Sequence, residues 1–87
     1  MTVLKLRAER LRWVEADGEV VALDEHSLMY LNANPSGALL WDALAAGATR
    51  EQLIDELMGA FDVDAEMASR DVDLFVADLE SRGLLEG

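Results

Sequence analysis

Four side chains with two kinds of chemistry recur along one side of the last helical segment of the chain. At about 100° per residue, their spacing places them on one stripe: Met67, Asp71, Leu74 and Asp78. The apolar pair could anchor apolar side chains of a ligand, and the carboxylates could hold a cation. The ordinary alternative is a boundary stripe whose acids face water. The pattern therefore marks a candidate groove wall.

A second candidate site is the short apolar stretch Ser27-Leu28-Met29-Tyr30-Leu31-Asn32. Alternate residues of a strand face opposite sides. One face carries Leu28, Tyr30 and Asn32, and the other carries Met29 and Leu31, so neither is a plain solvent face. At the edge of a sheet such a strand suits β-augmentation, in which a peptide pairs with the open backbone edge. The commoner alternative is a strand that covers both sides of a thin sheet.

Two earlier strands position this stretch. Residues 10–16 alternate, with Leu11 and Trp13 on one side, and Asp17-Gly18 follows as a hairpin signal. The continuous apolar run of residues 19–23 favours a central strand. We therefore predict a three-stranded antiparallel sheet with residues 28–32 as the third strand, at an edge.

Three helices should follow the sheet. Asn34-Pro35 is a good start for the first, and Gly47 ends it. Thr49-Arg50-Glu51-Gln52 is a capping box for the second, and the third runs from Asp64 to Gly83. The apolar face of the third helix, which we expect in the core, consists of Ala65, Ala68, Val72, Phe75, Val76 and Leu79. Strands followed by tightly connected helices predict a compact α+β domain with a helix-turn-helix.

Length and composition indicate one domain. The chain has 87 residues and is 52% hydrophobic, enough for one small core. We expect residues 1–9 to be loosely ordered and residues 10–87 to form the domain. No signal-peptide core or membrane-spanning run is present in the sequence, which predicts a cytoplasmic protein without a membrane partner.

Charge favours a basic partner. The formal net charge is −11, and most of the excess lies in residues 51–87. Such a field repels phosphate backbones and attracts basic peptides. A helix-turn-helix often binds DNA, but the third helix here is strongly acidic, so we expect no nucleic-acid partner.

Enzymatic and metal chemistry are disfavoured. The chain has no cysteine, and its one histidine, His26, falls in a predicted polar turn. No ligand pattern for a metal and no phosphate-binding glycine loop is present. We expect no catalytic residue, no cofactor and no bound metal.

Ser27 raises one further alternative. The run from Glu25 to Met29 is similar to the serine attachment motif of acyl and peptidyl carrier proteins, which are also small and acidic. In those proteins a helix precedes the serine and another starts at it. Here a hairpin precedes Ser27 and Pro35 interrupts the following helix, so this interpretation is the weaker one.

The order and spacing of several segments form one combined pattern: Val21-Ala22-Leu23-Asp24, residues 30–41 from Tyr30 to Trp41, residues 47–53 from Gly47 to Leu53, Asp71-Val72, Leu79 and Gly83-Leu84-Leu85. In this pattern nearly the whole chain from Arg10 onward resembles the PqqD-like family, the precursor-peptide recognition elements of ribosomally made, post-translationally modified peptide (RiPP) biosynthesis. One departure is Ala33, where relatives usually have a large apolar residue. Leu31 is the alternative anchor, which leaves the strand register open, and a one-residue slip would exchange the two faces.

The resemblance implies a winged helix-turn-helix that binds the leader segment of a precursor peptide as an added strand. It places the leader along residues 28–32 and against the third helix, beside the stripe that begins at Met67. The function implied is a non-catalytic adaptor that presents a precursor to a separate modifying enzyme or leader peptidase, and the acidic charge of the chain predicts basic residues in the leader. A general protein-interaction module using the same edge is the alternative.

Overall fold

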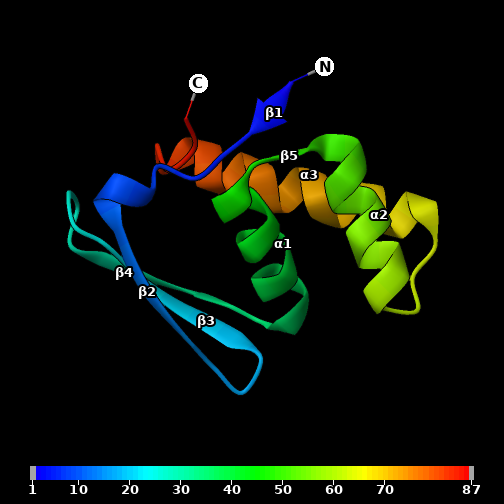
Figure 1. Ribbon diagram of the computed structural model, residues 1–87, viewed down its shortest axis with the longest axis horizontal. Coiled ribbons are helices and arrows are strands. Elements are labelled where there is room, and N and C mark those ends of the chain that lie inside the picture. The colour runs from blue at the N-terminus through cyan, green and yellow to red at the C-terminus, as the bar shows by residue number, and fades with distance from the viewer. Residues whose placement is uncertain (1, 87) are drawn as a thin grey trace.

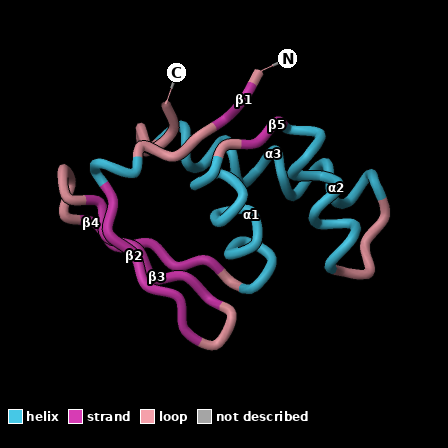
Figure 2. Tube along the Cα trace, in the orientation of Figure 1, coloured by secondary structure: helices cyan, strands magenta, loops and turns pink. Residues whose placement is uncertain are grey.

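The computed structural model describes residues 2–86, and a three-stranded antiparallel sheet lies to one side of its helices (Figures 1 and 2). The strands are β2 (Leu11–Ala16), β3 (Glu19–Asp24) and β4 (Met29–Ala33), in the order β2-β3-β4. Asp17 and Gly18 connect β2 to β3 with φ of 55° and 76°, as a tight hairpin turn requires. The predicted sheet is confirmed, with β4 as an edge strand.

The start of β4 differs from the prediction by one residue. Leu28 has a φ of 60°, and its N–H donates a hydrogen bond to the Asp24 carbonyl. It therefore belongs to the turn that closes the β3–β4 hairpin. Regular pairing begins with Met29 opposite Asp24 and ends with Ala33 opposite Val20.

Three helices follow, and each begins at its predicted cap. They are α1 (Pro35–Ala46), α2 (Arg50–Ala60) and α3 (Ala65–Ser81). The side chains of Asn34, Thr49 and Asp64 each accept a backbone N–H from the first turn, and Gln52 completes the capping box at α2. These bonds satisfy donors that a helix cannot satisfy internally. The α+β fold class and the three predicted helices are confirmed.

The N-terminal segment is ordered against the helices, where the sequence predicted loose structure. The strand β1 (Val3–Leu4) pairs with β5 (Ala48–Thr49), and a 3-10 helix spans Ala8–Arg10. Leu6 is fully buried and forms a bridge with Leu85. Burial of the Leu6 side chain explains why this segment is ordered. The sequence did not predict it because the bridge partner, Leu85, lies far away along the chain.

The core lies where α1 packs against β3 and β4 on one side and α2 on the other, with α2 packing against α3. Trp41 of α1 is fully buried, and the edge of its ring meets Trp13 with centroids 5.5 Å apart. On α3, Ala68, Val72 and Leu79 are buried as predicted. Ala65 is exposed, against the prediction, because it begins the first turn of α3.

No helix within residues 2–86 is long and apolar enough to cross a membrane.

Candidate functional site

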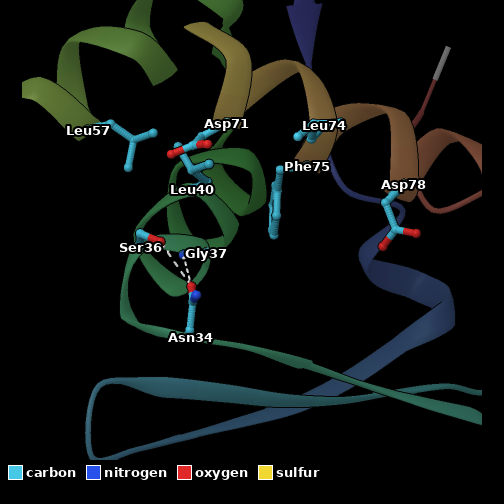
Figure 3. A pocket seen from close by; sticks show the side chains of 9 residues that line it. All are labelled: Asn34, Ser36, Gly37, Leu40, Leu57, Asp71, Leu74, Phe75 and Asp78. Carbon is cyan, nitrogen blue, oxygen red and sulfur yellow. Dashed lines mark hydrogen bonds between the residues drawn. The ribbon is translucent and has the colours of Figure 1, made fainter. Parts of the chain in front are cut away.

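Two hollows lie near the two ends of the edge strand β4, and we call them together the groove. The first, of about 390 Å³, lies after the end of β4 beside helix α3 and is drawn in Figure 3. The hollow is lined by residues from α1, α2, α3 and the turn before α1: Asn34, Ser36, Gly37, Leu40, Leu57, Asp71, Leu74, Phe75 and Asp78. Figure 3 shows Phe75 and Asp78 pointing from α3 toward the strands. We call this the Asp71 end of the groove.

A second hollow of about 220 Å³ lies at the start of β4. Its lining comes from β4, the residues around it and the chain after α3: Arg10, Asp24, Ser27, Met29, Leu31, Arg82 and Leu84. We call it the Arg82 end of the groove. Within residues 2–86, β4 pairs with β3 alone. Its other edge therefore offers backbone N–H and C=O groups for one more strand.

The structure separates the predicted strand residues by face. Met29 and Leu31 line the Arg82 end of the groove. Tyr30 is 68% exposed and lines a hollow on the opposite face of the sheet with Val21 and Leu23. Asn32 lies opposite Val21 in the ladder and so shares the face of Tyr30. The groove side of β4 therefore carries Met29 and Leu31.

Three of the four predicted α3 residues line the groove. Asp71, Leu74 and Asp78 belong to the Asp71 end, and Leu74 is 66% exposed. Met67 is half exposed and lies outside both hollows. Asp78 accepts a hydrogen bond from the Arg82 Nε at 3.2 Å. Asp71 has no ion-pair partner in the described part of the chain, so it is the acid most available to a ligand cation.

Several groove residues carried no functional signal in the sequence. Phe75, Leu40 and Leu57 have the helical spacing of core residues. Leu40 and Leu57 are buried beneath the hollow that they line, and Phe75 is partly exposed, an arrangement that depends on how α1, α2 and α3 meet. Gly37 lets α1 lie close to Ala33 at the end of β4 and to Phe75 of α3. A Cβ there would lie 3.1 Å from the Ala33 Cβ and 3.2 Å from the Phe75 Cε1. The small residue at position 33 and the glycine at 37 together make room for the Phe75 ring.

A polar cluster around Asp24 fixes the start of β4. Arg10 donates from Nε and Nη2 to the two carboxylate oxygens, at 3.3 and 3.1 Å, and from Nη1 to the Gly83 carbonyl at 3.4 Å. The His26 N–H and the Ser27 hydroxyl also donate to Asp24, at 3.0 and 2.8 Å. The cluster thus ties the β3–β4 turn to the chain that follows α3.

The same contacts stabilise the charged form of Asp24. Burial by itself would raise the pKa of this carboxyl, but the hydrogen bonds from Arg10, Ser27 and the His26 N–H, with the nearby guanidinium charge, lower it to about 2. A pKa below the ordinary value of 3.8 means that ionised Asp24 stabilises the fold. This contribution is present above about pH 4 and is lost as the pH falls toward 2.

We therefore expect Asp24→Asn to lower the melting temperature at neutral pH, with the difference from the wild type shrinking as the pH falls from about 4 to 2. Circular dichroism melts across this range would measure it. Asp55→Asn removes an acid of α2 for which no hydrogen bond is found within residues 2–86, and it serves as the control. A pH-independent difference for Asp24→Asn would contradict the assignment.

The Ser27 hydroxyl has a structural role, and His26 contributes its backbone N–H to the same cluster. The Ser27 hydroxyl donates to Asp24 and accepts from the Met29 N–H at 3.3 Å, and it lies in a turn between two strands. The helix that starts at the serine of a carrier protein is missing from this position. Among residues 2–86, no group of three or more His, Asp or Glu side chains could hold a metal ion.

The β2–β3–β4 sheet and the three helices define a winged helix-turn-helix domain. Residues 19–85 match the family model described as coenzyme PQQ synthesis protein D (PqqD). Since this match covers more than half of the chain, the chain belongs to the PqqD family. No curated protein matches it.

Two solved structures share the fold along almost the full chain. TbiB1, solved in complex with the TbiA(beta) leader peptide, is 28% identical with a TM-score of 0.86, and the match covers 95% of each chain. A lasso peptide synthetase B1, complexed with the leader peptide, is 25% identical with a TM-score of 0.81. That match covers 97% of this chain and 98% of the other. The predicted relationship to precursor-recognition proteins is confirmed at the level of family and fold.

Proposed function

We propose that this protein is a non-catalytic adaptor that binds the leader segment of a ribosomal precursor peptide and presents it to a separate modifying enzyme or leader peptidase. The leader adds as a strand to β4 and lies in the groove beside α3. The observation that carries the proposal is an edge strand with an open side and a hollow near each of its ends, in a fold whose solved relatives are complexes with leader peptides.

The groove has the parts that strand addition needs. The edge of β4 supplies main-chain hydrogen bonds, which tolerate many sequences. Leu74 and Phe75 at one end, and Met29 and Leu31 at the other, supply apolar surface for alternate side chains of the added strand. Main-chain pairing would provide affinity, and the two apolar hollows would fix the register.

Charge favours a leader with basic residues. The net charge of −11 attracts cations over the whole surface, and Asp71 in the groove supplies a local carboxylate without an ion-pair partner among residues 2–86. A Lys or Arg of the leader near Asp71 would gain a charge-assisted hydrogen bond. This complementarity would speed encounter and set register.

Binding alone can accelerate modification. If the adaptor also contacts the enzyme, the precursor is held near the active site at a raised effective concentration. The adaptor then needs no chemistry of its own. The gene neighbourhood would identify the pathway, because a short precursor gene beside an enzyme gene would name both partners.

The test is leader binding by charge variants of α3. Two fluorescein-labelled peptides serve as probes: the TbiA(beta) leader, and the N-terminal part of the precursor encoded beside the gene. We expect Asp71→Lys to weaken binding of a basic leader by about tenfold, the equivalent of one charge-assisted hydrogen bond. Fluorescence anisotropy would measure it.

Glu80→Lys is the matched control, because it makes the same charge change on α3 in a different hollow, beside Val76 and Ala77. It should weaken binding far less. Equal losses in both variants would show that net charge alone matters and would contradict the role of Asp71. Binding of neither peptide to the wild type would overturn the adaptor proposal.

A further inference from the structure

We infer that the Arg82 end of the groove is an anion-binding subsite, so that the groove selects a leader strand with a basic side chain at one end and an acidic side chain at the other. This inference rests on the proposed function and adds a substrate class to it. The acidic residue of the leader would meet Arg82, while the basic residue would meet Asp71. An apolar side chain beside the acid would fill the hollow next to Met29.

Arg82 has hydrogen-bond donors that are available to a ligand. Its Nε donates to Asp78, and its two Nη atoms have no hydrogen-bond partner among residues 2–86. The side chain is 38% exposed and lines the hollow. A guanidinium fork with free Nη atoms is suited to a carboxylate.

The neighbouring charges leave Arg82 as the available cation. Arg10 also lines this hollow, but both oxygens of Asp24 hold it in a two-point ion pair. Asp24 is in turn saturated by Arg10, Ser27 and the His26 N–H. The acid that faces Arg82 is Asp78, on the same helix, in an exposed pair of the kind that contributes little stability. An incoming carboxylate can therefore add to Arg82 without breaking a buried ion pair.

The apolar lining strengthens the subsite. Met29 is 59% exposed, Leu31 is half-buried and Leu84 is buried, and all three line the hollow. A peptide that covers Met29 would exclude water from around Arg82. A hydrogen bond to a charged group gains strength when water is excluded. The flexible Met side chain can adapt to the apolar residue that accompanies the acid.

The two ends of the groove set the spacing of the two charges. Asp71 and Arg82 are eleven positions apart on α3 and its C-terminal cap, or about 16 Å at 1.5 Å per residue. The strand β4, Met29–Ala33, spans about 13 Å at 3.3 Å per residue. An added strand covers these lengths with about four or five residues. Side chains on one face recur every second residue, so a separation of about four is expected.

The order of the two charges depends on strand direction. Antiparallel addition continues the pattern of the existing sheet. A strand antiparallel to β4 passes Ala33 first and Met29 last. The basic residue near Asp71 must then precede the acidic residue near Arg82 in the leader sequence.

The test uses a display library of random linear peptides selected on the wild type, on Arg82→Glu and on Arg70→Glu. Arg70 is the matched control, since it lies on α3, is 65% exposed and is absent from both hollows. On the wild type and on Arg70→Glu we expect enrichment of a Lys or Arg followed about four residues later by an Asp or Glu. On Arg82→Glu the acidic preference should disappear and a basic residue should replace it.

A peptide enriched on the wild type would then be synthesised with Glu or with Lys at the acidic position. We expect the Glu version to bind about tenfold more tightly, and the Arg82→Glu variant to reverse this order. Arg82→Gln, which keeps a polar side chain, should abolish the preference without reversing it. Circular dichroism would confirm that each variant is folded.

Equal binding of the Glu and Lys versions by the wild type would overturn the subsite and leave leader binding by β4 standing. Enrichment with the acid before the base would overturn the antiparallel placement. If no peptide is enriched and the leaders themselves do not bind, the adaptor function fails together with the subsite.

Discussion

Replacement of Leu74 by aspartate is expected to weaken leader binding by about ten- to a hundredfold while the domain stays folded. Leu74 is 66% exposed, so the free domain gains little from it. A bound peptide would cover it, and burial of a leucine side chain is worth about 1.5–3 kcal/mol. The bound peptide would also cover the new carboxylate, and removing its hydration costs free energy.

Met58→Asp is the control for this substitution. Met58 is an exposed apolar residue of α2 that lines neither end of the groove. Anisotropy with the labelled leader should show near wild-type affinity for this variant, and thermal melts should show that both variants are folded. Unchanged affinity in Leu74→Asp would remove α3 from the binding site.

The largest expected loss of stability follows from truncation of Trp41. The side chain is fully buried between the sheet and the helices and contacts Trp13 edge to face. Replacement of a buried tryptophan by alanine costs about 3–5 kcal/mol, which is a large part of the 5–15 kcal/mol typical of a whole domain. Urea denaturation should therefore show Trp41→Ala as mostly unfolded or marginally stable.

Two variants separate the possible reasons for such a loss. Trp41→Phe should be much milder, because the Trp41 Nε1 has no hydrogen-bond partner within residues 2–86, and its removal leaves no acceptor unpaired. Trp13→Ala should also cost less, because Trp13 is only partly buried. A loss for Trp41→Ala as small as that for Trp13→Ala would contradict a core centred on Trp41.

Local signals predicted the elements of the fold well. The Asp17-Gly18 hairpin and the caps at Asn34, Thr49 and Asp64 all stand where their residue types place them. Each of these features is decided by contacts within a few residues. The stripe on α3 could also be predicted, because helical periodicity alone puts Asp71 on the same side as Leu74 and Asp78.

Features that depend on distant contacts were harder to predict. The pairing of Val3 with Thr49 and the burial of Leu6 join segments far apart in the chain. Leu28 has a positive φ in the turn that the Asp24 cluster holds, and this cluster includes the distant Arg10. The turn conformation of Leu28 makes Met29 the first residue of β4.

The inward face of β4 was left open by the sequence for a related reason. Both faces carry apolar residues, so alternation alone could not distinguish them. The structure places Met29 and Leu31 toward the groove and Tyr30 on the other face. Ala33 and the Phe75 ring both lie close to Gly37, where a Cβ would be 3.1 Å from the Ala33 Cβ and 3.2 Å from the Phe75 Cε1, so a small residue at position 33 leaves room for the ring. Gly37 belongs to α1 and Phe75 to α3, so the sequence of β4 alone does not show why position 33 is small.

Amide hydrogen exchange, followed by NMR on the isotope-labelled domain with and without the leader, is the most direct test of strand addition. We expect the amides of β4 that face the open edge, within Met29–Ala33, to exchange at least about tenfold more slowly with the peptide bound, because each gains a backbone acceptor. The amides of β2, at the opposite edge of the sheet, should change little. Saturating peptide that leaves exchange along β4 unchanged would contradict leader binding at this strand.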